Sequence, residues 1–226
     1  MTDPRRPLAL FDLDDTLCDY SGARKQRLAI AFGHAPGLDP SVIEQVISAS
    51  IARHPHGSAH FPELLAEFGV DDPAIAGRAV AWYRENRFHG LRLFPEARDI
   101  LESLRTSGYP IGIITNGPAE TQRAKISLLG IDRLVDFAVV SGELGIEKPD
   151  PAIFAAALDL GGRAASEAIF IGDALEFDIL GAHRAGIRSI WMNRAGDRPE
   201  EDDPVPDHTA ANLGEVISIL DRWPLR

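Results

Sequence analysis

Five short apolar runs recur along the chain, and small or polar residues follow each of them. They cover residues 8–12, 109–115, 137–140, 168–171 and 188–192. Apolar runs of this length, bounded by turn-forming residues, are typical of buried strands. Between them the apolar spacing is helical, over roughly 96–107, 118–129, 150–160 and 175–185. This alternation predicts an α/β fold in which helices cover both faces of a parallel sheet.

The segment 18–92 breaks the alternation, because it contains no run that resembles a strand. Its apolar residues have helical spacing in four pieces separated by prolines, near 21–33, 40–52, 60–69 and 72–88. We therefore expect a helical cap domain over 18–92, inserted after the first strand. Residues 1–17 and 93–226 would together form the α/β catalytic core. Within that core, the acidic and proline-rich stretch 196–206 predicts a surface loop, and a last helix is expected near 212–222.

The composition excludes several classes of protein. Of the 226 residues, 45% are hydrophobic and 25% are charged, which is ordinary for a soluble globular protein. The formal net charge of −11 disfavours nucleic-acid polymers and anionic membranes as partners. No apolar run approaches the ~18 residues that would span a bilayer, and no signal peptide is evident. Because Cys18 is the only cysteine, no internal disulfide can form, and a reducing cytoplasmic location is expected.

Polar residues of a consistent kind stand at or just after four of the five predicted strands. They are Asp12 at the end of the first strand and Asp14 just after it, Thr115 and Asn116 at the second, Lys148 in the loop after the third, and Asp173 after the fourth. In a parallel sheet the carboxyl ends of the strands meet at one edge, where ligands bind. The sequence therefore predicts that these side chains converge.

The carboxylates at this edge suit the transfer of a phosphoryl group. Asp12 is the best candidate for a nucleophile, since a carboxylate that attacks phosphorus divides one difficult hydrolysis into two easier steps. Asp14 is two residues further on and would face the same side in an extended chain. It could protonate the leaving oxygen and later accept a proton from water. Asp173 would supply another oxygen ligand for a cation.

A metal ion is needed to balance these charges. Two unit charges ~4 Å apart repel by about 4 kcal/mol at an effective dielectric constant near 20. Mg²⁺ suits such an all-oxygen site and commonly bridges carboxylates to phosphate. The phosphate itself would be held by Thr115, by Asn116 with the following backbone amide, and by Lys148. Asp178 is expected to support the site by orienting Lys148 or a water molecule on the metal.

These residues resemble the four ordered motifs of the haloacid dehalogenase (HAD) superfamily of phosphohydrolases. The matching stretches are Asp12-Leu13-Asp14-Asp15-Thr16, Thr115-Asn116-Gly117, Lys148-Pro149 and Gly172-Asp173 with Asp178. The resemblance implies a Rossmann-like core with a helical type-1 cap. It also implies that Asp12 is the nucleophile, that Asp14 is the acid and base, and that Thr16 supports the first motif. The implied Mg²⁺ ligands are Asp12, Asp173 and the backbone carbonyl of Asp14.

The family resemblance favours a phosphatase of the nucleotidase or sugar acid phosphatase kind, acting on a small phosphorylated metabolite as a monomer or a homodimer. The dehalogenases that named the family lack an acid at the position of Asp14, because a halide departs without a proton. Asp15 replaces a glycine that is common in many relatives, including phosphoglycolate phosphatases. This replacement weakens an assignment to those relatives without excluding it.

Three alternatives remain open. A 2-haloacid dehalogenase would use Asp12 as nucleophile without a metal ion. A phospho-accepting signalling module also combines acidic residues, threonine and lysine at strand ends, although such domains are shorter and lack the insertion. A non-catalytic binding protein of the same fold is the third alternative. Outside the motifs, we expect Arg24-Lys25-Gln26-Arg27 to form a solvated helix face and Cys18 to be a small buried thiol.

Overall fold

The computed structural model describes residues 6–53 and 57–222, and the chain divides into two compact units. One unit contains the chain up to Asp19 and from Leu93 onward, and the other contains Tyr20–Arg92. The boundaries follow the change from alternating strands and helices to helices alone. None of the described helices is long and apolar enough to cross a membrane.

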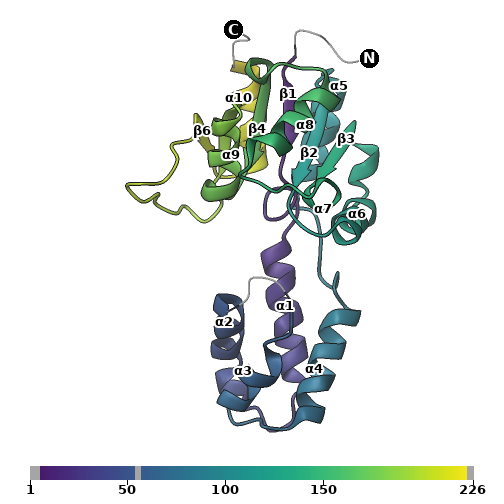
Figure 1. Ribbon diagram of the computed structural model, residues 1–226, viewed down its shortest axis with the longest axis vertical. Coiled ribbons are helices and arrows are strands. Elements are labelled where there is room, and N and C mark those ends of the chain that lie inside the picture. Colours follow the sequence, from purple (N-terminus) through teal and green to yellow (C-terminus); the bar gives the residue numbers. More distant parts are fainter. Residues whose placement is uncertain (1–5, 54–56, 223–226) are drawn as a thin grey trace. The chain divides into compact units, whose positions relative to one another are not determined.

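A six-stranded sheet forms the centre of the first unit (Figure 1). Its order is β3-β2-β1-β4-β5-β6, and every neighbouring pair is parallel. The strands are β1 (Leu8–Phe11), β2 (Ile111–Thr115), β3 (Phe137–Val140), β4 (Ala168–Gly172), β5 (Arg188–Met192) and β6 (His208–Ala210). The all-parallel sheet explains why the central strands are uninterrupted apolar runs, since both of their faces are buried.

Strand β1 lies between β2 and β4, and all four of its residues are buried. Its last residue, Phe11, is paired with Ile113 of β2 and with Ile171 of β4. The next residue, Asp12, is therefore at the carboxyl edge of the sheet, in the middle of the strand order. That edge is where the polar residues of the predicted site follow their strands.

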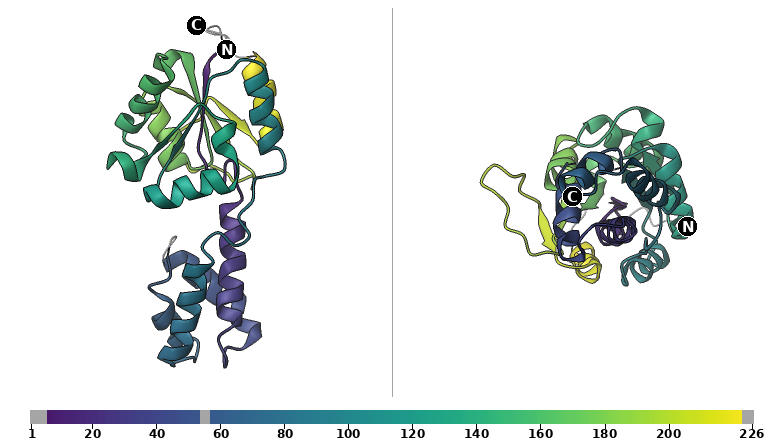
Figure 2. Two further views of the ribbon diagram at one scale, coloured as in Figure 1. Left: turned by 90° about the vertical axis from the view of Figure 1, so that its right-hand side faces the viewer. Right: turned by 90° about the horizontal axis from the view of Figure 1, so that it is seen from below.

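Helices cover both faces of the sheet (Figure 2). On one face α8 (Pro151–Gly161) contacts α9 (Leu180–Arg184), and on the other α5 (Ala97–Thr106) contacts α10 (Leu213–Arg222). The aromatic pair Phe154 and Phe170, with ring centroids 5.1 Å apart, fixes α8 against β4. Helix α6 (Ala119–Leu128) contacts β3.

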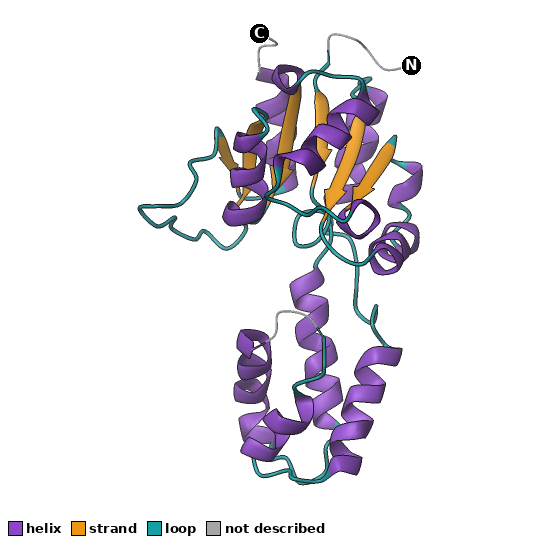
Figure 3. Ribbon diagram, in the orientation of Figure 1, coloured by secondary structure: helices purple, strands orange, loops and turns teal. Residues whose placement is uncertain are grey.

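The second unit consists of helices and loops over its described residues (Figure 3). The helices are α1 (Tyr20–Gly33), α2 (Ile43–Arg53), α3 (Phe61–Glu67) and α4 (Pro73–Glu85), with a short 3-10 turn at Pro40–Val42. Its own apolar core is centred on Phe61, whose ring lies 4.8 Å from that of Phe32 and 5.2 Å from that of Tyr83. Two prolines stand in the first turns of α3 and α4, where the missing N–H costs no intrahelical hydrogen bond.

The predicted α/β class and the five predicted strands are confirmed, and three local details differ. Strand β6 was not expected, because it has three residues and two of them are exposed. The four-residue helix α7 (Ser141–Leu144) was also missed. The helix predicted over 175–185 begins as a π-helix, η4 (Leu175–Ile179), and continues as α9.

The expectation of a solvated face over Arg24–Arg27 is wrong for its two arginines. Lys25 and Gln26 are exposed, but Arg24 and Arg27 are buried. The guanidinium of Arg27 lies 5.5 Å from the ring centroid of Tyr20 and 5.3 Å from that of Tyr83. Stacking of this kind stabilises a guanidinium away from water, and the sequence spacing does not reveal it. The expectation that Cys18 is a buried thiol is confirmed.

Candidate active site

Asp12 is held at the edge of the sheet by the strand that precedes it. Its backbone N–H donates to the carbonyl of Ile171 at 2.9 Å, which continues the pairing of β1 with β4 for one more residue. Its carboxylate is 8% exposed and has a cationic partner. A carboxylate in this position is oriented by the sheet and almost removed from bulk water.

Lys148 is the cation at the centre of the site. Its Nζ atom lies 2.5 Å from Oδ1 of Asp12 and 2.6 Å from Oδ1 of Asp178. The loop that carries Lys148 is fixed by Asn116, whose Nδ2 donates to the Lys148 carbonyl at 3.0 Å. The Oδ1 atom of Asn116 accepts from the backbone N–H of Lys148 at 2.9 Å. Asn116, expected to bind phosphate, therefore braces the loop of Lys148 with its side chain.

Asp173 follows β4 and is held on two sides. Its Oδ1 accepts a hydrogen bond from the hydroxyl of Thr16 at 3.2 Å. Its backbone carbonyl accepts from the indole Nε1 of Trp191 on β5 at 2.8 Å. Thr16 thus connects the loop after β1 with the loop after β4, which agrees with its expected supporting position.

Asp178 lies in the π-helical turn η4, and its carboxylate is buried. Its Oδ2 accepts from the backbone N–H of Ala174 at 3.1 Å, while Oδ1 contacts Lys148. A Cβ atom at Gly172 would lie 2.3 Å from Oδ2 of Asp178, so only glycine leaves room for this carboxylate. Of the two expected partners of Asp178, Lys148 or a water molecule on the metal, the structure shows a contact with Lys148.

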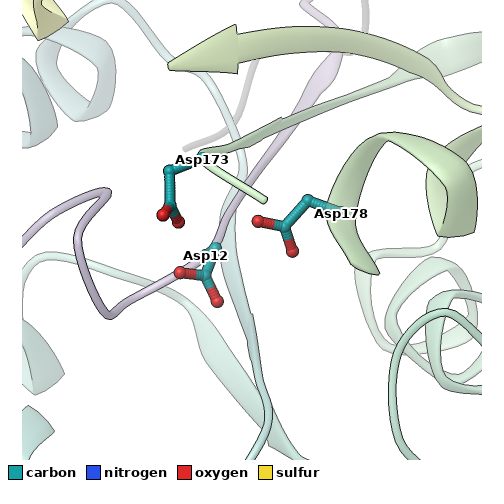
Figure 4. Close-up of side chains that lie close together, drawn as sticks. All are labelled: Asp12, Asp173 and Asp178. Carbon is teal, nitrogen blue, oxygen red and sulfur yellow. The ribbon is translucent and has the colours of Figure 1, made fainter. Parts of the chain in front are cut away.

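Three carboxylates converge at this point, as Figure 4 shows. One oxygen from each of Asp12, Asp173 and Asp178 lies within 4.8 Å of the others. These oxygens are the hard ligands that Mg²⁺ prefers. Lys148 supplies one positive charge against three carboxylates, so the donor set fits a divalent cation. Asp12 and Asp173 are the side chains that would hold it, since both oxygens of Asp178 already accept hydrogen bonds, one from Lys148 and the other from the backbone N–H of Ala174.

The electrostatics agree with this fit. Burial raises the pKa of Asp12 well above its usual value, and the carboxylates of Asp178 and Asp173 raise it further against the opposing effect of Lys148. Burial, with the charges of Asp178 and Asp15, raises the pKa of Asp173 to about 7. Burial disfavours the charged form of Lys148 and so acts to lower its pKa. The negative charges of Asp12 and Asp178 outweigh this effect and raise the pKa of Lys148 above its usual value. A cation would therefore favour the ionised form of both acids.

The carboxylate of Asp14 is held by side chains of helix α6. Its Oδ2 accepts from Nζ of Lys125 at 2.6 Å and from Nε2 of Gln122 at 3.1 Å, both on α6. Its Oδ1 lies 3.5 Å from the thiol of Cys18. The Asp14 side chain is 25% exposed, which makes it the most accessible of the acids expected in catalysis.

Thr115 and Gly117 occupy the end of β2 and the turn that follows. The Oγ1 atom of Thr115 accepts from Nε2 of Gln122 at 2.5 Å, so the same amide contacts both Thr115 and Asp14. The backbone N–H of Gly117 was expected to face a phosphate. It donates instead to the hydroxyl of Ser141 at 2.9 Å, because α7 packs against this turn.

Sequence reasoning missed Gln122, Lys125, Ser141 and Trp191 as neighbours of the site. A polar pair at positions i and i+3 on one face of α6 was the only available signal for the first two. That signal is weak, since solvated faces carry such pairs as well. Trp191 was visible only as an apolar residue of a predicted strand, and Ser141 as a turn residue after another.

Comparisons with known proteins point to one family. The profile of the haloacid dehalogenase-like hydrolases matches residues 7–186. A curated relative, the glyceraldehyde 3-phosphate phosphatase of Methanopyrus kandleri, is 33% identical over 225 residues, which is 93% of this chain and 95% of that protein.

Solved structures agree on the fold. A HAD-hydrolase from Bacillus subtilis bound to magnesium has a TM-score of 0.77 at 24% identity, covering 96% of this chain and 99% of that one. A 2-haloacid dehalogenase from Pseudomonas syringae has a TM-score of 0.61 at 32% identity, covering 97% of this chain and 100% of that one. The two structures share this architecture, but a fold alone does not fix the reaction, so the side chains of the site must indicate it.

Proposed function

The chain belongs to the haloacid dehalogenase-like hydrolases, and on this premise we propose that it is a Mg²⁺-dependent phosphomonoesterase that works through an aspartyl-phosphate. The coarse activity, hydrolysis of a phosphomonoester, is supported by the phosphatase that is 33% identical over nearly the whole chain. The observation that carries the finer proposal is the contact of Asp12 with Lys148, at 2.5 Å, beside the carboxylate of Asp173.

In the first proposed step, a carboxylate oxygen of Asp12 attacks the phosphorus atom of the substrate. A bond forms between that oxygen and phosphorus, and the bond between phosphorus and the ester oxygen breaks. Lys148 lies beside Asp12 and would bind the oxygens of the phosphoryl group. Thr115, with its hydroxyl at the end of the neighbouring strand, is the second proposed phosphate ligand, and Asn116 holds the Lys148 loop in place.

Asp14 is the proposed acid and base. It would donate a proton to the ester oxygen as that oxygen leaves, so that an alcohol departs in place of an alkoxide. In the second step a water molecule attacks the phosphorus of the aspartyl-phosphate and gives its proton to Asp14. The bond between phosphorus and Asp12 then breaks, which releases phosphate and restores both carboxyl groups to their starting forms.

Asp12, Asp173 and the backbone carbonyl of Asp14 are the proposed ligands of Mg²⁺. When bound, the ion would neutralise charge on the carboxylates and on the transferring phosphoryl group. The residues suit this ion because their donors are oxygens and because the carboxylates outnumber the local cations. Asp178 and Thr16 are proposed to support the ligands, the first through Lys148 and the second through Asp173.

A dehalogenase is the second candidate, since the 2-haloacid dehalogenase from Pseudomonas syringae is 32% identical to this chain. Displacing a halide needs a nucleophile such as Asp12 but no proton donor. Asp14 is held by two donors from α6 and is partly exposed. It would have no catalytic role in that reaction, because the halide leaves without a proton. The presence of this acid is the specific observation that favours the phosphatase.

The inserted unit, Tyr20–Arg92, is proposed to act as a cap that selects the substrate. It enters the chain six residues after Asp14, so its sequence can vary without altering the residues that follow the strands. A small phosphorylated metabolite is the proposed substrate class. A triose phosphate is a natural first compound to assay, because that is the substrate in the name of the 33% identical relative.

A panel of phosphate monoesters, assayed with and without Mg²⁺, tests the proposal. We expect release of phosphate that depends on Mg²⁺ and stops on addition of a chelator. Asp12→Asn should abolish turnover while leaving the circular dichroism spectrum unchanged. Chloride release from a 2-haloacid in the presence of chelator, without any phosphatase activity, would establish the dehalogenase instead.

A further inference from the structure

The carboxylate of Asp14 is held by two side chains of α6 that belong to none of the four sequence motifs. Both Lys125 Nζ, at 2.6 Å, and Gln122 Nε2, at 3.1 Å, donate to the same oxygen, Oδ2. We propose that Lys125 and Gln122 are positioning residues that orient Asp14 for proton transfer to the leaving group. This inference rests on the proposed function, because it assigns a purpose to contacts with the proposed acid.

Burial of these polar side chains requires an explanation. Lys125 is 4% exposed and Gln122 is 1% exposed, although both are polar residues of helix α6. An ammonium group removed from water is costly unless it has a charged partner, and an apolar side chain in its place would often stabilise the fold equally or better. The carboxylate of Asp14 is the charged partner of Lys125. The neighbouring Arg123 differs, because it pairs with Glu143 at 2.7 Å on the exposed side of the same helix.

The two oxygens of Asp14 have unequal surroundings. Oδ2 accepts from both α6 donors, whereas Oδ1 lies 3.5 Å from the thiol of Cys18, which is a weak donor. Two donors on Oδ2 fix the rotation of the carboxyl group and leave Oδ1 as the oxygen that can carry a transferable proton. The side chain is 25% exposed, so a leaving group can approach it.

Gln122 extends this arrangement to the proposed phosphate site. The same Nε2 atom that donates to Asp14 also donates to Oγ1 of Thr115, at 2.5 Å. The amide therefore ties the proposed acid to the threonine at the end of β2. A substrate whose phosphoryl group lies at Thr115 would have its ester oxygen at a distance from Asp14 that Gln122 helps to determine.

The proposed step has a clear chemical consequence. As the bond between phosphorus and the ester oxygen breaks, the proton on Oδ1 of Asp14 moves to that oxygen. An alkoxide is a poor leaving group and needs this proton, while p-nitrophenolate is stable enough to leave without it. A misplaced Asp14 should therefore slow alkyl phosphates much more than p-nitrophenyl phosphate.

The test compares kcat/KM for an alkyl phosphate and for p-nitrophenyl phosphate, in saturating Mg²⁺. This parameter reports the steps through the first phosphoryl transfer, so slow hydrolysis of the aspartyl-phosphate does not affect it. We expect Lys125→Met to lower kcat/KM for the alkyl ester by about 10–100-fold and for the aryl ester by less than about threefold. Gln122→Leu should show the same selectivity to a smaller degree. Lys125→Arg should restore part of the loss, and the matched control Arg123→Met should alter neither value.

Several results would overturn the inference. Equal losses of kcat/KM for the alkyl and aryl esters in Lys125→Met would indicate a structural role of Lys125. If neither Lys125→Met nor Gln122→Leu changes the ratio of kcat/KM between the two esters, these residues have no role in proton transfer. If Lys125→Met lacks the native circular dichroism spectrum, the ratios of Gln122→Leu and Lys125→Arg decide. Failure of the proposed function is a separate outcome, because the unmodified protein would then hydrolyse neither ester.

Discussion

Nζ of Lys148 lies 2.5 Å from Oδ1 of Asp12, and both side chains are more than nine-tenths buried. The two residues are 136 positions apart in the sequence. The parallel sheet brings them together, since one follows β1 and the other belongs to the loops beyond β3. A cation fixed against a buried carboxylate limits the repulsion that an incoming phosphate would meet there.

Replacing this cation should therefore damage both stability and activity. In Lys148→Met the carboxylates of Asp12 and Asp178 lose their common partner, and a broken buried ion pair typically costs about 3–5 kcal/mol. We expect kcat to fall by about 10²-fold or more, since one fixed positive group at a transferring phosphoryl is lost. Thermal unfolding without metal measures the first effect, and steady-state assays measure the second.

The exposed pair of Arg53 and Glu67 offers a matched control for the Lys148 prediction. Removing this cation, in Arg53→Met, should change the free energy of unfolding by less than about 1 kcal/mol, because the pair is solvated. A Lys148→Met variant that is as stable and as active as this control would contradict the position we assign to Lys148.

Gly172 gives a steric test of the site. In Gly172→Ala the new Cβ would lie 2.3 Å from Oδ2 and 2.5 Å from Cγ of Asp178, whose carboxylate is fixed by Lys148 and by Ala174. Overpacking of this kind costs about 1–3 kcal/mol and would displace Asp178. We expect a lower midpoint of denaturant unfolding together with a reduced kcat.

Gly77 in α4 provides the control for that substitution. It has no atom within 4 Å of an added Cβ, so Gly77→Ala should be neutral or stabilise the fold by up to about 1 kcal/mol. Equal effects of the two alanine substitutions on kcat would show that the space beside Asp178 is unimportant.

The sequence predicted most of the sheet, because β1, β2 and β4 are buried on both faces and their apolar runs are unmistakable. It could not predict β6, because this strand has three residues and its histidine and threonine are exposed, so that it shows no apolar run. The start of the helix after β4 as a π-helical turn was equally hidden, since one turn of five residues is too short to show a period that differs from that of a regular helix.

The candidate site was predictable where a polar residue directly follows a strand, as with Asp12 and Asp173. It was not predictable where a helix reaches back toward the sheet, as with Lys125. The partner of Lys125 is Asp14, 111 residues away, and only the packing of α6 brings the two together. The bonds of the Asn116 side chain to the backbone of Lys148 were not predictable either, because hydrogen bonds to a distant loop leave no mark in the local sequence.

Asp15 explains one departure from the family pattern in physical terms. Its φ angle is 59°, in the left-handed region that glycine favours and that aspartate tolerates better than most residues. Asp15→Gly should therefore retain kcat within about threefold, whereas Asp15→Val should cost about 1–2 kcal/mol of unfolding free energy. Urea unfolding of the two variants measures this difference. Equal stability of the glycine and valine variants would show that this backbone conformation is not required.

The raised pKa of Asp173, about 7, links metal binding to pH. Below that value the folded protein holds a proton on Asp173, and Mg²⁺ must displace it in order to bind the carboxylate. The affinity for Mg²⁺ should therefore fall by up to about tenfold per pH unit as the pH drops below 7. Calorimetric titration of the protein with Mg²⁺ at pH 6 and pH 8 measures this change.

The same pKa predicts how the stability of the metal-free protein varies with pH. The unfolded chain releases the proton of Asp173 near the ordinary value of 3.8, whereas the folded chain keeps it up to about pH 7. Protonation thus favours the folded state, and this contribution is complete below pH 3.8 and is lost as the pH rises through 7. The melting temperature without metal should decline over that interval, with Mg²⁺ restoring it at pH 8 and having little effect at pH 5.

Asp173→Asn should remove both the site-specific decline and the rescue by Mg²⁺, while keeping the slower trend that comes from the net charge of −11. If the asparagine variant follows the pH dependence of the unmodified protein, the proton is held elsewhere, and Asp12 would be the next carboxylate to replace.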